Sequence, residues 1–443
     1  MRNDNAIATL AGWMSALPEL NALYQLAALL FVLVVTQRFK AMAFLAMVAA
    51  TGIFGLAQGA ALPWTAKEFN TGFGQTIAAA GLAILAGAML SRLAEASGAA
   101  GWWGRRFRWP AAALFGAMAG VGGTPIGALA VLAPVVRAAG AARRRAALAA
   151  SSGVIAAHGC LLPSPLPIAA LAILGGDWRL CLLLGLPVAA AQILLGLILA
   201  RGAPDSEVAP AEAAGSPRAA WGALLAVLVM IALIIAQGLG QIPSEPFGGG
   251  TARENLLGLG RPMILLLAGL GFALLAMGAN HRTAIAEDGW LAQGARQGLG
   301  VFLAVGAAGG FQMVLHNNGM AELLSERLLA LPPGLGVAIP FVVALVNRAI
   351  QGSPLSAAIT AAGMMQPLLP LLGLESEVGR ALAAVAVGAG AMAAPHLNDG
   401  YFWLAADQAG LSPLGALRRI TGAALAQGTL AVAVLVLLAW ICQ

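Results

Sequence analysis

Two short stretches decide the fold of this 443-residue chain: Gly122-Gly123-Thr124-Pro125 and Gln351-Gly352-Ser353-Pro354. Each stands at the centre of an apolar segment. Each joins glycine, which accepts unusual backbone angles, to proline, which lacks the N–H that a helix needs. A helix is therefore expected to break at both centres. The segments, about 110–136 and about 336–372, are each predicted to form a re-entrant hairpin of two short helices.

The charges beside these segments predict the membrane face from which each hairpin enters. Seven arginines and no acidic residue flank the first segment. The positive-inside rule places such loops in the cytoplasm, so the first hairpin is expected to enter and leave from that face. Around the second segment the basic excess is gone, and the outer face is preferred. The flanking charges are Arg105, Arg106, Arg108, Arg137, Arg143, Arg144 and Arg145 for the first segment, and Glu322, Glu326, Arg327, Glu375, Glu377 and Arg380 for the second.

The composition of the whole chain indicates a membrane protein. Hydrophobic residues make up 60% of the sequence and charged residues 9%, against about 25% charged in soluble proteins. Many apolar runs reach the roughly 20 residues that cross a bilayer as a helix, and they are continuous rather than alternating, which excludes a porin-like barrel. The net charge of +6 comes from 22 Arg and two Lys, an excess typical of cytoplasmic loops, and we expect no nucleic-acid binding.

The apolar runs are of two kinds. Two of them are interrupted by polar residues and prolines and are predicted to be broken helices: about 146–176, broken at His158–Pro165, and about 381–408, broken at Pro395–Gly400. The others are predicted to span the membrane without interruption, which gives about 10 full crossings in total. The uninterrupted runs lie at about 20–36, 41–62, 76–92, 180–200, 219–238, 262–279, 298–316 and 420–440.

The order of these elements repeats along the chain. Two helices, a hairpin, a broken helix and a further helix occur in 41–200 and again in 262–443, and the predicted crossings turn the second copy upside down. The helix within 1–40 and the linker with its extra helix, 201–261, lie outside the repeat. We therefore predict an all-α polytopic membrane protein with an inverted repeat, which is typical of secondary transporters whose site lies near the midplane.

Arg348 is the first candidate for contact with a solute. An arginine inside an apolar hairpin leg costs about 2.5–3.5 kcal/mol on insertion scales, and its planar guanidinium can bind a carboxylate through two hydrogen bonds. We therefore expect an anionic solute here. Two structural alternatives stay open, because Arg348 could extend to the outer surface or could pair with Asp399.

The two hairpin tips supply further candidates for solute binding. Backbone N–H groups and short polar side chains at helix N-termini favour anions and hydroxyl groups. The alternative is that these residues only turn the chain. The candidates at the tips are Gly123, Thr124, Gln351, Gly352 and Ser353.

Both breaks in the broken helices hold polar or titratable residues. Asp399 and His396 are predicted to carry the coupling proton, with Asp399 as the first choice, because a carboxylate at membrane depth must titrate or be paired. His396, Asn398, His158 and Ser164 are further candidates for solute binding. Alternatively, Asp399 caps the following half-helix and the other side chains satisfy freed backbone groups.

Several other classes of protein lack their motifs in this chain. No GxxxxGK[ST] phosphate loop occurs, which disfavours an ATP-driven pump, and the HExxH motif of a metalloprotease is absent. The three cysteines have no CxxC spacing and the four histidines form no ligand set, so we predict no metal and no cofactor. A membrane-embedded enzyme that uses His158 and His396 as acid and base is the remaining alternative outside transport.

Four stretches of the chain are also familiar as a set: Phe69-Asn70-Thr71-Gly72-Phe73-Gly74, Ser97-Gly98-Ala99-Ala100, Arg348-Ala349-Ile350-Gln351-Gly352-Ser353 and His396-Leu397-Asn398-Asp399-Gly400-Tyr401-Phe402-Trp403. Together they resemble the gluconate:proton symporter (gluconate permease) family of the ion transporter superfamily, over most of the chain from about Phe69. The resemblance implies proton-coupled symport of a gluconate-like sugar acid or related hydroxycarboxylate across a bacterial inner membrane. It also implies a moving transport domain on a scaffold, and a homodimer.

The first hairpin departs from the family pattern. Family members commonly carry bulky aromatic and acidic residues about its tip, whereas 120–127 here holds only small or aliphatic uncharged residues. The particular acid and the coupling ion therefore stay open. The alternatives are a Na⁺-coupled carboxylate carrier and an exporter or antiporter of the same fold.

Overall fold

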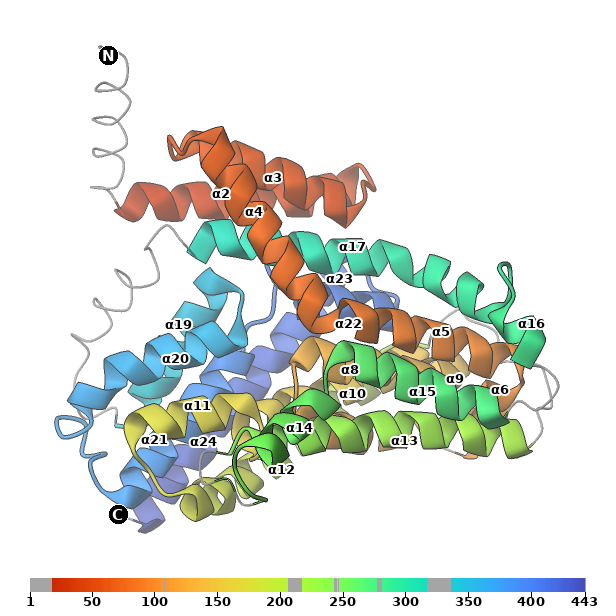
Figure 1. Cartoon of the computed structure of the whole chain (residues 1–443). Coiled ribbons are helices and arrows are strands. Elements are labelled where there is room, and N and C mark those ends of the chain that lie inside the picture. The colour runs from red at the N-terminus through yellow and green to blue at the C-terminus, as the bar shows by residue number, and fades with distance from the viewer. Residues whose placement is uncertain are drawn as a thin grey trace.

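The computed structural model describes residues 18–106, 108–205, 217–242, 245, 247–276, 281–316 and 336–442. Throughout these ranges the chain is helical and contains no strand (Figure 1). Residues 1–17 and much of the predicted linker, including 206–216, lie outside the described residues. So do Glu322, Glu326 and Arg327, on which the charge argument for the second hairpin partly rests.

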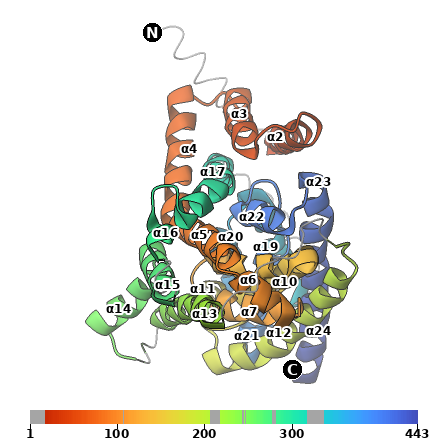
Figure 2. The ribbon, with the colours of Figure 1, turned by 90° about the vertical axis from the view of Figure 1, so that its right-hand side faces the viewer.

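The first half opens with two helices that pack together along one edge of the molecule, α2 (Pro18–Arg38) and α3 (Ala43–Ala57) (Figures 1 and 2). After them, α4 (Leu62–Thr76) continues through a π-helical turn at Ile77–Gly81 into α5 (Leu82–Ala96). The last three form one helix of 35 residues. Single π-helical turns inside α-helices occur frequently at functional sites.

The predicted span at 41–62 is wrong in its C-terminal bound, because the helix ends at Ala57. The stretch 63–75, which the hydropathy pattern leaves between two spans, is helical. Lys67 and Asn70 are exposed on this helix, so their polar side chains do not interrupt it. A hydropathy window records their polarity but not the face on which they lie.

A second long helix, α17 (Trp290–His316), lies beside the first and packs against α3, α4 and α5. The short helix α16 (His281–Ile285) precedes it. Small residues let the two backbones approach closely. A Cβ atom on Gly72 would overlap the carbonyl group of Gly309, and one on Gly309 would overlap the Thr76 hydroxyl. These two glycines therefore fix the register between the long helices.

Helix breaks occur in all four irregular segments, close to the predicted positions. The two predicted hairpins each contain helices that are joined at a short tip, and the two predicted broken helices each contain two helices separated by a short non-helical stretch. The first hairpin holds α7 (Ala111–Gly120), α8 (Pro125–Val131) and α9 (Ala133–Ala138), and the second holds α19 (Ala338–Gln351) and α20 (Pro354–Met365). The broken helices are α10 (Arg143–Cys160) with α11 (Pro165–Leu174), and α21 (Glu377–Met392) with α22 (Gly400–Ala409).

The two tips have the same local geometry. Gly123 has φ 62° and Gly352 has φ 72°, and each glycine precedes a hydroxyl residue that caps the next helix. The hydroxyl accepts a hydrogen bond from the backbone N–H three residues later, at 3.0 Å for Thr124 and 3.3 Å for Ser353. Glycine with a positive φ turns the chain at each tip, and the cap with the proline that follows it starts the next helix.

The remaining described helices surround these elements. A short helix that the sequence did not predict, α14, lies within the linker region and is bent by 63° against α15. The remaining helices are α6 (Ala99–Arg106), α12 (Trp178–Arg201), α13 (Pro217–Gly240), α14 (Thr251–Leu259), α15 (Pro262–Ala276), α23 (Pro413–Ala416) and α24 (Gly422–Cys442), and a π-helical turn at Leu417–Thr421 joins the last two.

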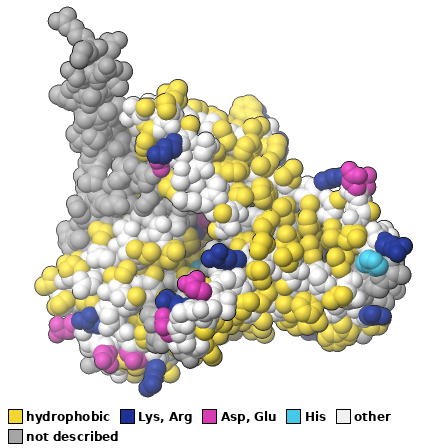
Figure 3. All heavy atoms as spheres, in the orientation of Figure 1, with side chains coloured by type: hydrophobic (Ala, Val, Ile, Leu, Met, Phe, Trp, Pro, Cys, Tyr) yellow, Lys and Arg dark blue, Asp and Glu magenta, His cyan; other side chains and the backbone are white. Residues whose placement is uncertain are grey.

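The surface and the helix lengths are those of a multi-pass membrane protein. Six helices in the described ranges are long and apolar enough to cross a bilayer, or seven if α14 and α15 count as one span. Hydrophobic side chains cover much of the face in Figure 3, and charged side chains lie at its edges and in one group near its centre. The predicted total of about 10 crossings stays a prediction, because it also counts apolar segments that are not among these six or seven long helices.

Arginines at the start of α10 join three regions of the chain. Arg143 donates a hydrogen bond of 2.8 Å to the carbonyl group of Gln408, and Arg144 donates one of 3.2 Å to that of Ala409. Arg145 donates one of 3.2 Å to the carbonyl group of Ala203. These arginines therefore hold the C-terminal end of α22 and the loop after α12.

Candidate functional site

The two hairpin tips meet at one cavity, which we call the tip cavity. Its volume is about 370 Å³. Both tips line it, together with the N-terminus of α22 and the facing residues of α4, the first π-helical turn and α17. Its polar lining residues are Gln75, Thr76, Thr124, Gln312, Ser353, Ser356, Asp399 and Tyr401.

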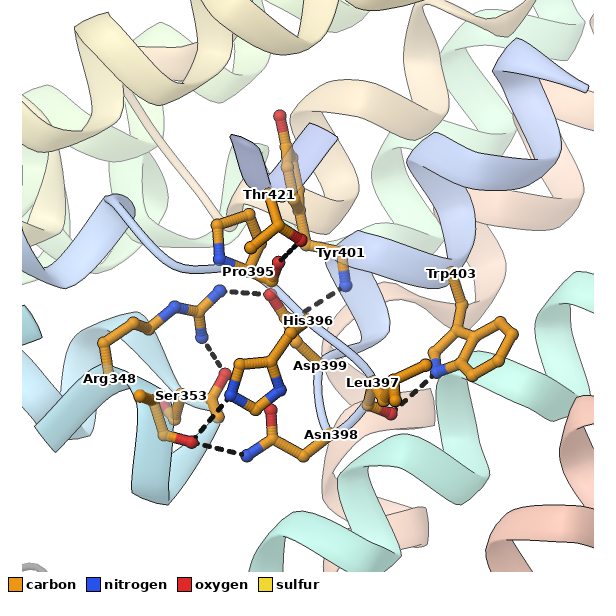
Figure 4. A network of polar contacts seen from close by, with 12 residues as sticks. Arg348, Ser353, Pro395, His396, Leu397, Asn398, Asp399, Tyr401, Trp403 and Thr421 are labelled. Carbon is orange, nitrogen blue, oxygen red and sulfur yellow. Dashed lines mark hydrogen bonds and ion pairs between the residues drawn. The ribbon is translucent and has the colours of Figure 1, made fainter. Parts of the chain in front are cut away.

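Arg348 and Asp399 form a buried ion pair at the edge of this cavity (Figure 4). One terminal nitrogen of Arg348 contacts the Asp399 carboxylate, and the other donates to the carbonyl group of Gly352. The Arg348 side chain is 1% exposed and that of Asp399 is 4% exposed. Asp399 is among the residues that line the cavity, and Arg348 is not.

The second oxygen of Asp399 caps α22. It accepts a hydrogen bond of 2.9 Å from the backbone N–H of Tyr401. The Tyr401 hydroxyl lies 2.8 Å from the Ser151 hydroxyl and donates to the Ser151 carbonyl group at 3.0 Å, which ties α22 to α10. Pairing with Arg348 and capping of α22, the two structural alternatives for Asp399, are thus both present.

His396 and Asn398 hold the end of the first leg of the second hairpin. The His396 Nε2 lies 2.8 Å from the carbonyl oxygen of Ala349, and the Asn398 amide donates to the carbonyl groups of Ala349 and Ile350 at 3.2 Å each. The last carbonyl groups of a helix have no partner within the helix, so these side chains supply one. Gln25 of α2 donates to the Ile350 carbonyl group as well, at 3.1 Å.

The first half has the same histidine contact. His158 Nδ1 lies 2.9 Å from the carbonyl oxygen of Gly120, four residues before Thr124, just as Ala349 lies four residues before Ser353. The Ser164 hydroxyl donates to the His158 carbonyl group at 2.6 Å. Both predicted residues of the first break therefore bond to backbone groups.

The charged pair has no counterpart in the first half. Matched by the spacing of the two tips and of the two histidines, the positions of Arg348 and Asp399 are taken by Ala119 and Leu161. Both of these first-half side chains are apolar. The structure therefore concentrates the charge of the tip region in the second half.

The structure divides the predicted site residues into two groups. Those that line the tip cavity are Thr124, Gly352, Ser353 and Asp399. Those that lie outside its lining are Arg348, Gln351, His158, Ser164, His396 and Asn398, together with Gly123, which lines an adjoining cavity of about 1130 Å³. Gln351 donates to the Asn347 side chain at 3.0 Å and to the Thr360 hydroxyl at 3.4 Å.

Five polar cavity residues were missed from the sequence. Gln75 and Thr76 precede the π-helical turn, Gln312 lies on α17, Ser356 lies in the first turn of α20, and Tyr401 follows the cap of α22. The sequence could have indicated these residues only as polar residues within helical stretches. It does not show which of the polar residues in a helix face a cavity. In the described ranges, no group of three or more His, Cys, Asp or Glu side chains is placed to hold a metal ion.

Multiple apolar spans, paired helix breaks and a shared polar cavity between the breaks define a membrane transport protein. The sequence profile of the GntP family permease matches residues 20–441. The chain belongs to this family, which consists of permeases and not of enzymes.

Known relatives match along most of the chain. The sequence is 29% identical over 399 residues to a gluconate permease of Pseudomonas aeruginosa, which covers 84% of this chain and 87% of that protein. It is 26% identical over 401 residues to the high-affinity gluconate transporter of Escherichia coli, with 83% and 87% covered. Among solved structures, the YdaH transporter of Alcanivorax borkumensis matches with a TM-score of 0.38 and 16% identity, over 84% of this chain and 87% of that one.

Proposed function

We propose that the protein is a secondary active symporter that carries a gluconate-like sugar acid, or a related hydroxycarboxylate, with a proton across the bacterial inner membrane. The observation that carries the proposal is the tip cavity, where both hairpin tips meet Asp399, the ion-pair partner of Arg348. The solute class rests on the two gluconate-transporting relatives.

The charges around the cavity favour binding of the anion together with a proton. Among the described residues that line the cavity, Asp399 is the only one with a charged side chain. An ionised Asp399 would repel a solute carboxylate, because like charges interact strongly in a site of low dielectric constant. Protonation of Asp399 removes this repulsion and leaves the positive charge of Arg348 to attract the solute. The proton and the anion then occupy the site as a neutral pair.

Arg348 keeps donors for this second partner. Its Nε is buried and has no hydrogen-bond partner among the described residues. Protonation of Asp399 would also weaken the contact that now occupies one of the terminal nitrogens. A small movement at the second hairpin tip would therefore turn the Arg348 guanidinium toward a solute carboxylate.

The other wall of the cavity suits a chain of hydroxyl groups. The side-chain amides of Gln75 and Gln312 make no hydrogen bonds within the described part of the chain, and both line the cavity. Each amide offers two donors and one acceptor oxygen. A polyhydroxylated acid can use these groups, whereas a purely apolar carboxylate would leave them without partners.

A Na⁺-coupled carrier is less well supported by the same contacts. Unwound backbone carbonyl groups and carboxylates are the usual Na⁺ ligands in broken-helix transporters. Here the Asp399 carboxylate and the Gly352 carbonyl group are both engaged by Arg348. The positively charged guanidinium of Arg348 therefore occupies the position between these two oxygen ligands that a bound Na⁺ would take.

We further propose that the two halves form an inverted repeat whose tips enter from opposite faces and meet near the midplane, within a homodimer. The matching tip caps and the matching histidine contacts support the repeat. The meeting of both tips at one cavity supports a shared site.

Uptake into proteoliposomes tests the function. Radiolabelled gluconate and a panel of uronic, glyceric and C4 acids are offered under an inward proton gradient, with and without Na⁺. We expect accumulation that a protonophore abolishes and that Na⁺ does not change. Accumulation that only a Na⁺ gradient drives would show sodium coupling in place of proton coupling. Chemical conversion of the labelled acid by the purified protein would indicate an enzyme.

A further inference from the structure

A second cavity, away from the hairpin tips, lies between α12 and the start of α24. Its volume is about 290 Å³, roughly ten times the 30 Å³ that a water molecule occupies in the liquid. Small residues leave the room: Gly196 and Ala200 line it from α12, and Gly422 and Ala426 line it from α24. We call it the α12–α24 cavity.

Two arginines with unused donors line the same cavity. Arg418 makes no hydrogen bond or ion pair within the part of the chain that the structure describes. Arg419 donates one long hydrogen bond, 3.4 Å, to the carbonyl group of Gly202. The nearby carboxylate of Asp205 is already paired with Arg145. The cavity therefore presents positive charge that the described chain does not neutralise.

A hydroxyl without a protein partner also lines this cavity. Ser152 of α10 is 3% exposed, and its hydroxyl makes no hydrogen bond among the described residues. A hydroxyl in this position can donate to, or accept from, a water molecule or an oxygen-rich ligand in the cavity.

The helices that border the cavity present apolar side chains outward. Leu194 and Ile198 of α12 are 62% and 69% exposed, and Leu425 of α24 is 40% exposed. In a membrane protein such faces contact lipid chains. A ligand held here would thus have an anionic, oxygen-rich head at the cavity and apolar chains along the helices, which is the chemistry of an anionic phospholipid.

We propose that the α12–α24 cavity binds the phosphate and glycerol of an anionic phospholipid, with Arg418 and Arg419 on the phosphate and Ser152 on a glycerol or ester oxygen. Basic pockets between membrane helices are a known type of site for such headgroups. Arg145, which the charge pattern places in the cytoplasm, donates to the carbonyl group of Ala203, next to the Gly202 carbonyl group that Arg419 contacts, so the lipid would belong to the cytoplasmic leaflet. This proposal does not depend on the transported solute.

Lipid binding by the purified full-length protein tests the proposal. Dioctanoyl-phosphatidylglycerol is titrated into detergent-solubilised protein, with dioctanoyl-phosphatidylcholine and inorganic phosphate as parallel arms, and binding is measured by native mass spectrometry and by the shift in Tm. We expect phosphatidylglycerol alone to bind and to raise Tm. Inorganic phosphate that raised Tm equally would overturn the lipid assignment in favour of a free-anion site.

Two kinds of variant locate the site. Arg418→Gln/Arg419→Gln should weaken phosphatidylglycerol binding roughly thirtyfold, since each basic side chain contributes about a factor of five near an anionic headgroup. Gly422→Leu adds a side chain to the cavity without changing charge. A Cβ atom at Gly422 would lie 3.9 Å from the Leu417 carbonyl oxygen, an ordinary van der Waals contact, so the variant should fold. It should weaken binding as well.

The matched control is Arg179→Gln/Arg282→Gln, which removes the same charge from two exposed arginines outside the cavity. It should bind phosphatidylglycerol normally. Equal losses in this control would show a non-specific surface effect, and unchanged binding in Gly422→Leu would show that the headgroup does not enter the cavity. Either result would overturn the proposal, and Gly422→Leu decides it should the double arginine variant fail to fold.

Discussion

Arg348 and Asp399 pair across the gap between the second hairpin and the second broken helix, 51 residues apart in sequence, and both are almost fully buried. The pair joins a hairpin leg to the start of α22. Removal of one partner from a buried ion pair commonly costs about 3–5 kcal/mol, because the other charge is left without compensation. The pair therefore stabilises the tip region, and any transport cycle that uses either residue must keep the net charge low.

Arg348→Lys tests the role of the guanidinium. An ammonium group is a single point of charge and cannot contact Asp399, the Gly352 carbonyl group and a solute carboxylate in one plane. We expect the initial rate of gluconate uptake to fall at least about tenfold while the protein stays folded in detergent. Arg179→Lys, at an exposed position on α12, serves as control. Near-normal uptake by Arg348→Lys would remove this residue from the solute site.

Asp399→Asn tests the proton carrier. The asparagine keeps an oxygen for the N–H of Tyr401, so the cap of α22 is retained, but the side chain no longer titrates. We expect gradient-driven accumulation to disappear while exchange of labelled for unlabelled solute continues. A variant that still accumulates solute against its gradient would show that the proton travels on another group.

Gln312→Leu tests recognition of the hydroxyl chain. The variant loses one or two hydrogen bonds to the solute, worth about 0.5–1.5 kcal/mol each. Uptake of a long polyhydroxylated acid should therefore fall at least about threefold relative to uptake of a short hydroxy acid such as glycerate. The measured quantity is the ratio of kcat/KM for the two solutes. Gln58→Leu, outside the tip cavity, should leave this ratio unchanged. An equal loss for both solutes would assign Gln312 a structural role only.

Gly352→Ala tests the backbone of the second tip. Gly352 has φ 72°, and a Cβ atom there would lie 2.7 Å from the carbonyl oxygen of Asn398, so strain and collision act together. We expect a loss of about 1–3 kcal/mol in stability, seen as a lower Tm in detergent. Gly363→Ala on α20, where a Cβ atom meets nothing within 4 Å, should be neutral or slightly stabilising. Equal Tm values for the two variants would contradict the proposed strain.

The local features of the fold were predictable because they depend on neighbouring residues. Glycine before a hydroxyl residue and proline ends one helix and starts another, and Thr124 and Ser353 do cap the helices that follow them. The predicted end of the span at 41–62 was wrong, because it was placed from the polarity of the residues alone. Residues 63–75 are helical, because Lys67 and Asn70 lie on an exposed face.

The candidate site was predictable only in part. Thr124, Ser353 and Asp399 line the cavity, as expected of residues at helix breaks. Gln75 and Gln312 were missed because they lie in regular helical stretches, and their exposure to the cavity depends on how α4 and α17 cross. Whether Arg348 meets the solute stays a prediction, since in this structure it contacts Asp399 instead.

By itself, the sequence determined where helices stop and which runs are apolar enough to enter a bilayer, because backbone freedom, capping and hydrophobicity are properties of adjacent residues. Only the tertiary structure decided that both tips share one cavity, that Arg348 pairs with Asp399, and that the arginines at the start of α10 hold the end of α22 and the loop after α12. Such contacts join residues far apart in the chain, and the packing of helix against helix, which no local pattern encodes, sets their distances.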